Sequence, residues 1–548
     1  MKIRNKFYFF LFVALFLLGF VPADKDIYLE IAKNLEIFGK VYKEISINYV
    51  DKINPESFMR TGIKAMLGEL DPYTVFLDES MQKDFDLINN GKYSGIGASV
   101  GIRNGKITII DIIYDSPAQR EGLRIGDVIL EINSKEINKD NFDKMTNEIT
   151  GNPGKNVKLL IEREGLDDPQ IFNLRLEQIE IKNISYFGFF PEGSNNAYIK
   201  LSGFSRGAGE EIKQAIIDLR KIRKINSIIL DLRNNPGGLL EEAIDVSEKF
   251  ISKGKLIVSI SGRDSSKKLD YFSQEKPLAS DVVLAILVNE NTASAAEIVA
   301  GAVQDHDCGI IIGKNTFGKG LVQTIVPITN KTSLKITTAK YFTPSGRCIQ
   351  KINYSTDNKP IESYKDNRQL KYFTENNRNV YANGGITPDT ILENNDESEL
   401  IIDLKSKNLI GQFANYYINT EDSIDFRNLN EKILFEGFTK FLDIKNYKFN
   451  SGANVEAKKL LSKFKSNKVD LALINQFNNI VSALDKNEAL QIQKEQDEIL
   501  SLIRIELYNR IANRTDRYKL LLREDTLLKS AINMLSNHNK YEEFLKNN

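Results

Sequence analysis

The sequence predicts an α+β protein built from several domains. At 548 residues the chain is longer than one hydrophobic core supports, and its length indicates roughly three or four domains. Strand-like apolar runs separated by turn residues occupy the middle of the chain, whereas helical spacing of apolar residues marks both ends. With 41% apolar and 27% charged residues, the composition is that of a globular protein, which excludes a disordered or fibrous chain.

The N-terminus predicts export. Basic residues between Met1 and Lys6 precede the apolar run Phe7–Phe20, and small residues follow in Val21-Pro22-Ala23. This order is typical of a secretory signal, and the run is short for a membrane-spanning helix of about 20 apolar residues. We assign residues 1–23 to a signal peptide, with a retained inner-membrane anchor as the alternative, and expect the rest of the chain in the periplasm or cell envelope.

Charge, cysteine and histidine content narrow the classes of partner. Lys and Arg total 74, as do Asp and Glu, so the chain lacks the basic excess of a nucleic-acid-binding protein. The two cysteines, Cys308 and Cys348, leave one disulfide conceivable. The two histidines, His306 and His538, form no metal-ligand spacing with them. We therefore expect no nucleic-acid partner, no metal and no cofactor.

The first half of the chain divides into a helical segment and a β-rich module. Residues 24–80 show helical spacing up to Leu70-Asp71-Pro72-Tyr73, where the proline stops the helix. Residues 81–180 contain Tyr93-Ser94-Gly95-Ile96-Gly97 and short apolar runs between turn residues. The strands predicted in this module are Ala98–Ile102, Lys106–Ile113, Val128–Ile132 and Val157–Glu162.

Residues 181–395 alternate between strands and helices, which predicts an α/β layer. Each predicted strand is an apolar run bounded by turn signals. The predicted strands are Ala197–Leu201, Ser227–Leu232 and Val282–Val288, and the predicted helices are Gly209–Arg223, Leu239–Ser252 and Ala293–Gln304.

Residues 396–548 predict long amphipathic helices. Ile499, Ile503, Leu507 and Ile511 form a stripe that is typical of a buried helix face. The region shows no internal repeat, no chemical motif and no family resemblance. Its role stays open between a dimer element, a substrate gate and a partner-docking arm.

Ser294 is a candidate nucleophile. It follows a predicted buried strand and begins a predicted helix, with small neighbours that let a substrate backbone approach. The oriented N–H groups of a helix N-terminus favour developing negative charge. Serine is also a common helix cap, and on position alone the cap is the more frequent use.

A serine nucleophile needs a base, and neither histidine suits. His538 lies in a polar tail, and His306 lies near the far end of the helix that Ser294 begins, about 18 Å along its axis. Lysine is the next candidate, and Lys319 lies between Gly318 and Gly320, where other chain segments can approach closely. Burial of such a lysine disfavours its charged form, which would let it accept a proton. A solvated loop lysine is the alternative.

The segment Gly313–Gly320 also imitates a phosphate-binding loop. A true loop of this kind ends in Ser or Thr and enters a helix. Here Gly320 takes the place of the hydroxyl residue, and a predicted strand, Leu321–Pro327, follows. Nucleotide binding is therefore disfavoured.

Two further segments are less decisive. Gln323 would share a face with Lys319 in an extended strand but lie about 13 Å away, unless the chain bends at Gly320. Asp231–Gly238 is a strand end followed by turn residues, and we expect its role to be mainly architectural, with Asp and Arg tying loops together.

Taken together, these segments resemble the C-terminal processing peptidases, or tail-specific proteases. The resemblance runs from about Asp24 to Asp389, and the ordered set of segments is more specific than any one of them. The segments are Leu70–Tyr73, Gly95–Gly97, Tyr198–Ser205, Asp231–Gly238, Asn291–Glu297, Thr316–Gln323, Thr337–Arg347 and Gly385–Asp389.

The resemblance implies a role for each matching residue. It makes Ser294 the nucleophile, Lys319 the general base and Gln323 the residue that orients the lysine. It implies an oxyanion hole from the backbone N–H groups of Gly203 and Ala295, and a crotonase-like peptidase core. The β-rich module resembles a PDZ domain, with Ser94, Gly95, Ile96 and Gly97 as the loop that binds a substrate's terminal carboxylate.

The sequence thus predicts a serine endopeptidase that cuts exported proteins selected by their C-terminal tails. A catalytically inactive PDZ scaffold that binds such tails is the alternative, and a nucleotide hydrolase is the second rival. Protein or peptide substrates with free C-termini are the expected partners. An adaptor or lipoprotein and a homo-oligomer stay open.

Overall fold

The computed structural model describes most of the chain after residue 24. The chain forms two compact units, Met1–Asp78 with Gln323–Thr337, and Glu79–Val322 with Thr338–Asn548. The expected signal segment lies outside the described residues. These are residues 25–78, 91–264, 266–330, 332–354, 359–360, 370–382, 384–391, 397–421, 424–467, 470–510 and 514–546.

The first unit contains the predicted N-terminal helices and the end of a hairpin. Helix α2 (Lys25–Asn48) contacts α3 (Pro55–Gly68), where the Tyr42 and Phe58 rings stack with centroids 6.1 Å apart. Helix α3 ends before Pro72, as predicted. The strand β1 (Val75–Leu77) pairs antiparallel with β18 (Thr332–Phe342), which pairs with β17 (Leu321–Thr329).

The β-rich module of the second unit closes around its own core. Its sheet has the order β3-β4-β5-β7-β8, with β6 beside β5, and the predicted strands are confirmed to within a residue or two. Where β5 begins and β7 ends, the buried Arg163 donates to both carboxylate oxygens of Asp127 at 2.8 and 2.7 Å. The elements are β2 (Lys92–Gly95), β3 (Ala98–Arg103), β4 (Lys106–Ile112), α5 (Pro117–Arg120), β5 (Val128–Ile132), β6 (Lys135–Glu136), α6 (Phe142–Thr146), η1 (Asn147–Ile149), β7 (Asn156–Glu162), β8 (Gln170–Arg175) and β9 (Glu177–Glu180).

The central sheet of the second unit has the order β10-β11-β12-β15-β16-β23. Strand β10 is antiparallel to its neighbour, and the remaining neighbours are parallel. Helix α8 ends at Glu248, short of the predicted Ser252, because the chain turns at Lys249. The elements are β10 (Ile184–Phe189), β11 (Asn196–Leu201), α7 (Ala208–Ile222), β12 (Ser227–Asp231), α8 (Leu240–Glu248), β15 (Val283–Val288), α9 (Ala295–Asp305), β16 (Ile310–Gly313) and β23 (Thr390–Ile391).

Alternate residues of this sheet enter two different cores. Ile228, Leu230 and Ile286 pack with helices α7, α8 and α9. Ile229 and Leu287 face the other way, where they pack with the C-terminal helices. Both faces are therefore covered, as a parallel sheet requires.

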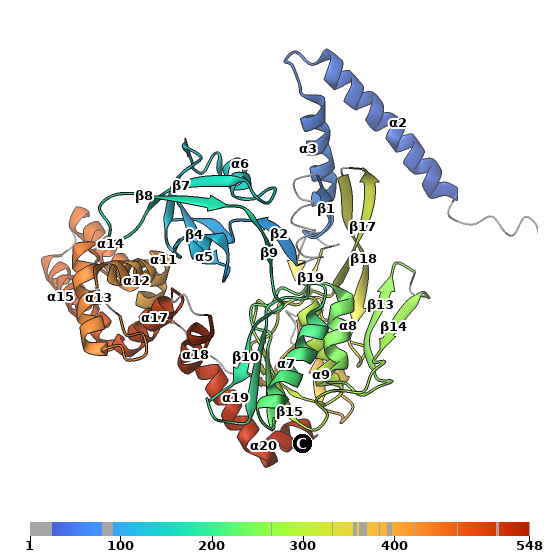
Figure 1. Ribbon diagram of the computed structural model, residues 1–548. Coiled ribbons are helices and arrows are strands. Elements are labelled where there is room, and N and C mark those ends of the chain that lie inside the picture. Colours follow the sequence, from blue (N-terminus) through green and yellow to red (C-terminus); the bar gives the residue numbers. More distant parts are fainter. Residues whose placement is uncertain are drawn as a thin grey trace, which may run out of the picture. The chain divides into compact units, whose positions relative to one another are not determined.

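The second face is covered by the last helices of the chain, which lie beside the sheet in Figure 1. They are α18 (Arg514–Glu524), α19 (Thr526–Ser536) and α20 (His538–Leu545). Tyr541 reaches the interior strand β15, where its hydroxyl lies 3.2 Å from the Leu284 carbonyl oxygen. The C-terminal region is thus part of the sheet's hydrophobic core.

The remaining C-terminal helices form a further core. Phe413, Phe438 and Phe441 are buried at its centre. Ile499, Ile503 and Leu507 of the predicted stripe are buried, whereas Ile511 lies outside the described residues. The helices are α11 (Glu399–Ser406), α12 (Leu409–Thr420), α13 (Glu431–Ile444), α14 (Gly452–Ser466), α15 (Leu471–Ala489), α16 (Gln491–Lys494) and α17 (Gln496–Tyr508).

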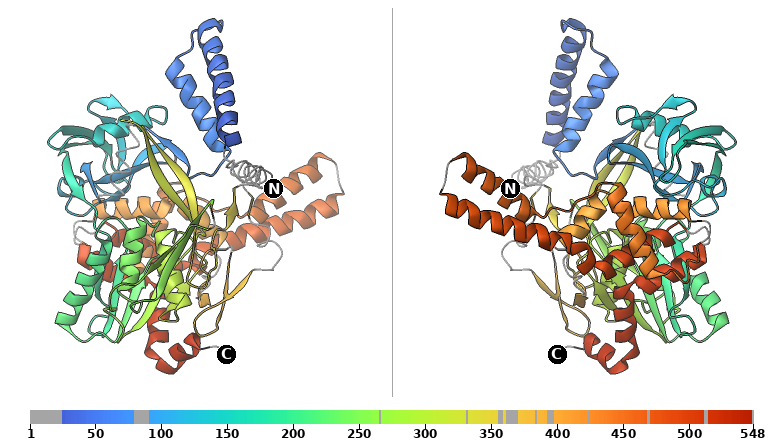
Figure 2. Two further views of the ribbon diagram at one scale, coloured as in Figure 1. Left: turned by 90° about the vertical axis from the view of Figure 1, so that its right-hand side faces the viewer. Right: turned by 90° about the vertical axis from the view of Figure 1, so that its left-hand side faces the viewer.

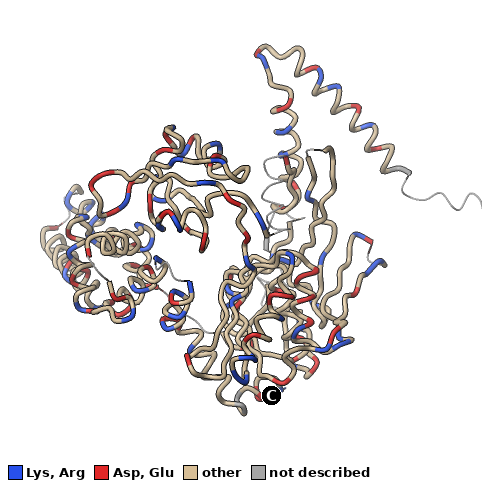
Figure 3. The backbone as a smooth tube through the Cα atoms, in the orientation of Figure 1, with Lys and Arg blue, Asp and Glu red and all other residues tan. Residues whose placement is uncertain are grey.

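Helices α14 and α15 form a pair of their own (Figure 2, orange), joined by the Phe464 and Phe477 rings with centroids 5.0 Å apart. Both basic and acidic residues are spread over the C-terminal helical region (Figure 3). None of the helices in the described ranges combines the length and apolar character that crossing a bilayer requires.

The C-terminal helices also contact the β-rich module. Asn419 of α12 donates to the Glu164 carbonyl oxygen at 2.7 Å, and Lys445 forms an ion pair with the Glu164 carboxylate at 2.8 Å. Asn104 donates to the Lys407 carbonyl oxygen at 3.1 Å. The helical region therefore contacts both the module and the central sheet.

Smaller strands complete the second unit. Strand β13 pairs with β14 and with the C-terminal part of β18, where Ile260 faces Tyr341. Both cysteines, Cys308 and Cys348, are free thiols, and burial raises the pKa of Cys308 to about 12. The strands are β13 (Leu256–Gly262), β14 (Lys268–Phe272), β19 (Ile352–Asn353), β20 (Lys359–Pro360), β21 (Lys371–Phe373) and β22 (Asn379–Tyr381).

Replacing Leu528 with alanine should destabilise the sheet. Leu528 of α19 is fully buried against it, so the cavity should cost about 2–5 kcal/mol and lower the Tm measured by calorimetry. Ile433→Ala is the matched control, because Ile433 lies in the same helical region but is 55% exposed. Equal Tm changes in the two variants would contradict this role for α19.

Candidate active site

Ser294 lies between β15 and α9 in a strained backbone conformation. Its φ is 56° and its ψ is −118°, and its side chain is half-buried. A serine that serves only as a helix cap normally has extended backbone angles, whereas positive φ is uncommon outside glycine and costs about 1–3 kcal/mol. Surrounding contacts must therefore hold this residue in place, which argues against a simple cap.

The loop before Ser294 is bound to the Asp231–Gly238 segment. The buried Thr292 donates its hydroxyl to the Leu232 carbonyl oxygen at 2.9 Å. The Ala293 N–H donates to the Asn235 carbonyl oxygen at 2.9 Å. The backbone on the N-terminal side of Ser294 is thus fixed by two bonds to one neighbouring turn.

Lys319 lies in a loop between β16 and β17 that runs beside Ser294. The Phe317 N–H donates to the Thr292 carbonyl oxygen at 3.0 Å. The hydroxyl of the buried Tyr341 lies 3.2 Å from the Ser294 carbonyl oxygen and also bonds to the Lys319 carbonyl oxygen. The structure therefore brings the segments of the predicted nucleophile and base together.

The fully buried carboxylate of Glu297 joins these two segments directly. Its Oε2 accepts the Ser294 N–H at 2.8 Å and the Lys319 N–H at 2.9 Å. Its Oε1 accepts the Gly318 N–H at 2.8 Å and the Thr316 hydroxyl at 2.5 Å. One side chain thereby fixes both backbones, and both of its oxygens are occupied.

Two opposing effects set the pKa of Glu297. Burial raises its pKa to about 7, although the hydrogen bonds from Thr316, Lys319, Gly318 and Ser294 favour the ionised form. The carboxylate that holds the two segments therefore titrates near neutral pH.

Gly237 packs against Ser294 at a distance that excludes any side chain. A Cβ at Gly237 would lie 2.8 Å from the Ser294 Cβ and 2.8 Å from the Ala295 nitrogen, and its φ is +94°. The Gly237 carbonyl oxygen accepts the Phe204 N–H at 3.2 Å. Gly237 thus contacts both Phe204, the residue after Gly203, and Ala295.

The N–H groups of Gly203 and Ala295 have no hydrogen-bond partner among the described residues, whereas the neighbouring Phe204 and Glu297 N–H groups are occupied. The first N–H groups of a helix such as α9 generally lack a partner within the helix. Both groups can therefore donate to a ligand oxygen.

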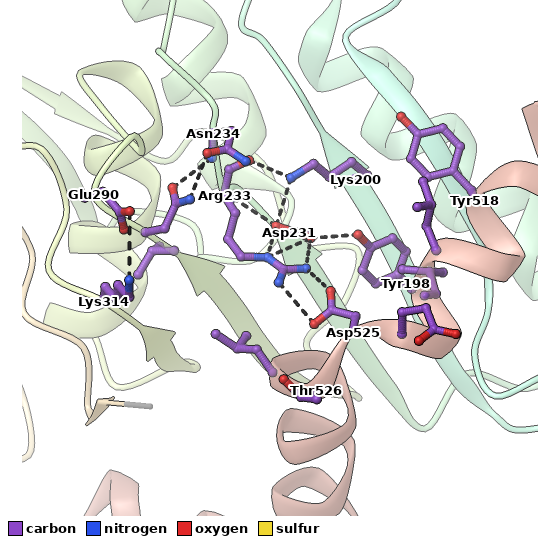
Figure 4. Close-up of a pocket in the computed structure, with 16 residues that line it drawn as sticks. Tyr198, Lys200, Asp231, Arg233, Asn234, Glu290, Lys314, Tyr518, Asp525 and Thr526 are labelled. Carbon is purple, nitrogen blue, oxygen red and sulfur yellow. Dashed lines mark hydrogen bonds and ion pairs between the residues drawn. The ribbon is translucent and has the colours of Figure 1, made fainter. Parts of the chain in front are cut away.

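The Asp231–Gly238 segment begins in a buried ionic cluster (Figure 4). Asp231 accepts hydrogen bonds from Arg233 Nη2 at 2.5 Å, Tyr198 at 2.7 Å and Lys200 Nζ at 3.0 Å. Burial alone would raise the pKa of Asp231, but the charges of Lys200 and Arg233 hold it well below its usual range. Asp231 and Arg233 therefore tie neighbouring segments together, as predicted.

The segment Thr337–Arg347, which is one of those that carry the family resemblance, contacts the C-terminal end of α9. Arg347 is fully buried and donates to Gln304 at 2.7 Å and Asp305 at 2.8 Å. His306 caps the same helix end, as predicted, and its Nε2 lies 2.6 Å from the Leu256 carbonyl oxygen. The His538 side chain lies outside the described residues.

The predicted carboxylate-binding loop connects β2 to β3 of the β-rich module. Strand β3 is an edge strand of the described sheet. The Ile96 N–H already donates to the Ile149 carbonyl oxygen at 3.1 Å, which removes one of the expected donors in this conformation. A Cβ at Gly97 would lie 2.1 Å from the Ser116 Cβ, and one at Gly95 would lie 2.9 Å from the Tyr93 ring. The buried Ser94 hydroxyl has no hydrogen-bond partner among the described residues.

Gln323 belongs to the first unit, where its side-chain amide donates to the Thr337 hydroxyl at 3.2 Å. The described site is therefore built from residues of the second unit. The strand β17 that begins at Leu321 also confirms that no helix follows Gly320, in contrast to a phosphate-binding loop.

Sequence reasoning missed the roles of Glu297 and Tyr341. The spacing Ser294-Ala295-Ala296-Glu297 is that of a capping box, in which the glutamate accepts the backbone N–H of the first residue. That signal could have identified Glu297 as a partner of Ser294. Its bonds to the Lys319 loop, and the position of Tyr341, depend on tertiary contacts and leave no local pattern.

Three family models match parts of the chain. The model "Peptidase family S41" matches residues 195–359, and a PDZ domain model matches residues 94–171. The model "Probable PDZ-protease, C-terminal helical domain" matches residues 400–535, which corrects our finding of no family resemblance after residue 396.

Curated relatives match more than half of the chain. It is 34% identical over 328 residues to the carboxy-terminal-processing protease of Bartonella bacilliformis, covering 59% of this chain and 74% of that protein. It is 34% identical over 315 residues to the carboxy-terminal processing protease CtpA of Bacillus subtilis, covering 57% and 66%. A solved photosystem II D1 C-terminal processing protease aligns with 23% identity and a TM-score of 0.39, covering 64% of this chain and 86% of that one.

Gly237→Ala should greatly reduce fluorophosphonate labelling of Ser294, the predicted nucleophile. The added methyl group would collide with Ser294 and shift it, and displacement of a reacting group by about 1 Å can cost about 100-fold. The measurement is the rate at which a small fluorophosphonate labels the serine. Gly254→Ala is the control, because it has a similar φ of +84° but nothing within 4 Å. Equal labelling of the two variants would contradict the packing argument.

The stability contribution of Glu297 should fall as the pH rises from about 4.5 to about 7. In this window the folded state binds more protons at Glu297 than the unfolded state, so raising the pH favours unfolding. Urea titrations of wild type and Glu297→Gln should show their difference in unfolding free energy falling by about 3 kcal/mol across the window, then levelling off. A difference that stays constant with pH would show that Glu297 does not titrate there.

Proposed function

Because this chain belongs to the carboxy-terminal processing proteases of peptidase family S41, and is a serine-type peptidase, we propose that Ser294 is its nucleophile and Lys319 its general base. The observation that carries the assignment is the Glu297 carboxylate, which accepts the N–H groups of both residues. The backbones of a strained serine and a loop lysine are thus held by one buried carboxylate, which supports their assignment as a preorganised pair.

The proposed reaction is amide hydrolysis through an acyl-enzyme. Ser294 Oγ attacks the carbonyl carbon of the peptide as its proton passes to Lys319 Nζ. The N–H groups of Gly203 and Ala295 donate to the oxyanion, and the lysine returns the proton to the leaving amine. Water then attacks the ester and releases the second product. Gln323 is assigned to orient the lysine.

Substrate selection is assigned to the β-rich module. A tail would add as a strand beside β3, with its carboxylate at the loop of Ser94, Gly95, Ile96 and Gly97. The Gly97 N–H supports this proposal, because it has no hydrogen-bond partner among the described residues and belongs to a loop residue with a positive φ. Exported proteins with free C-termini are the proposed substrates, and the envelope is the proposed location.

Ser294→Ala and Lys319→Ala should each abolish cleavage, because the first removes the nucleophile and the second removes the base. The measurement is cleavage of one unfolded polypeptide with and without an apolar C-terminal tail. Wild type should cleave the tailed substrate faster, and Ser294→Ala should still bind the tail in fluorescence anisotropy.

Two outcomes would contradict the proposal. Equal cleavage by wild type and both variants would exclude the pair. Tail binding by a wild-type protein that cleaves neither substrate would show that the chain is a binding scaffold.

A further inference from the structure

A cavity of about 420 Å³ lies between the carboxyl ends of β11 and β12 and the helices α18 and α19 (Figure 4). The buried ionic cluster around Asp231 forms one wall, and Asp525 contributes the other. Arg233 lies between the two carboxylates. Its Nη1 and Nη2 donate to Asp525 at 3.2 and 2.5 Å, while Nε and Nη2 donate to Asp231.

Arg233 is the first residue of the turn that contacts the loop of Ser294. Its backbone N–H donates to Asp231 at 2.9 Å, and its carbonyl oxygen accepts Lys200 Nζ at 2.6 Å. The next residue, Asn234, donates its N–H to the Asn289 side chain at 2.8 Å, in the loop that precedes Ser294. Both the side chain and the backbone of Arg233 are therefore fixed by the cluster.

The remainder of this turn touches the nucleophile itself. The Asn235 carbonyl oxygen accepts the Ala293 N–H, and Gly237 packs on Ser294 and Ala295. A continuous set of contacts thus runs from Asp525, through Arg233 and its turn, to the proposed nucleophile. Asp525 lies outside the residues that match the peptidase family model.

We infer that Asp525 is a positioning residue for Ser294, acting through the Arg233 side chain. The inference rests on the proposed role of Ser294. A planar guanidinium between two carboxylates is held in one orientation by paired charge-assisted bonds. Without the Asp525 charge, the Arg233 guanidinium loses a charged hydrogen-bond partner. The two cations, Lys200 and Arg233, then share the single negative charge of Asp231. The turn that supports Ser294 then loses its fixed starting point.

This arrangement gives the C-terminal helices a role in catalysis. The same helical region contacts the β-rich module through Asn419 and Lys445. Asp525 therefore connects the turn that supports Ser294 to the C-terminal helical region. That region also contacts the β-rich module, to which tail binding is assigned.

Two substitutions can separate the effect of the Asp525 charge from the role of Asp525 as a helix cap. Asp525 also caps α19, accepting the Leu528 N–H at 2.9 Å. Asparagine caps a helix about as well as aspartate. Asp525→Asn thus keeps the cap and removes the charge, whereas Asp525→Ala removes both. Lys519→Gln is the matched control, because it removes another ion pair between α18 and the sheet region, Lys519 with Glu192 at 2.7 Å.

In the full-length protein, Asp525→Asn should lower kcat and the rate of fluorophosphonate labelling of Ser294 by about tenfold, with KM for a tailed polypeptide changed less than about twofold. Asp525→Ala should show the same losses and a lower Tm, because only it loses the cap. Lys519→Gln should match wild type in its cleavage kinetics, in its labelling rate and in its Tm.

Wild-type labelling of Asp525→Asn would overturn the inference, as would equal losses in Lys519→Gln, since either result would reduce Asp525 to a docking contact. Ser294→Ala in the same labelling assay separates the two proposals. If that variant is labelled like wild type, the assignment of the nucleophile fails. If it is unlabelled while Asp525→Asn reacts normally, only the positioning role fails.

Discussion

The Glu297 carboxylate is buried among the backbones that carry Ser294 and Lys319, and the geometry of the site depends on satisfying that charge. An isolated carboxylate in a protein interior is costly, so it must accept hydrogen bonds from whatever surrounds it. Here the donors are the N–H groups of the two residues assigned to chemistry and of their neighbours. Because one buried carboxylate must accept N–H groups from both loops, it fixes the distance between them.

The rest of the second unit supports this arrangement from several sides. Gly237 leaves space for the strained Ser294 backbone, and Tyr341 bonds to the carbonyl oxygens on either side of the site. The C-terminal helices cover the face of the central sheet that α7, α8 and α9 leave open. That region was the least interpretable part of the sequence, yet it supplies both a hydrophobic core and, through Asp525, a contact with the turn beneath Ser294.

Local patterns predicted the elements and singled out Ser294 and Lys319 as candidates, but not the contacts that join them. Strands such as Val128–Ile132 and the position of Ser294 before α9 follow from apolar runs and turn residues, which are local. The function of Glu297 depends on the loop of Lys319, and that of Asp525 depends on Arg233, far away in the sequence. The occupied Ile96 N–H likewise depends on Ile149 across the module. Such contacts arise only once the chain is folded, so spacing alone could not reveal them.

Amide hydrogen exchange of Ser294, Gly318 and Lys319, compared between wild type and Glu297→Gln, tests the central claim most directly. If one carboxylate holds both segments, these amides should be protected in wild type and exchange much faster in the variant, while amides in the middle of α9 keep their protection. Unchanged protection of the three amides in Glu297→Gln would contradict the account, because the two segments would then be held together without the buried charge.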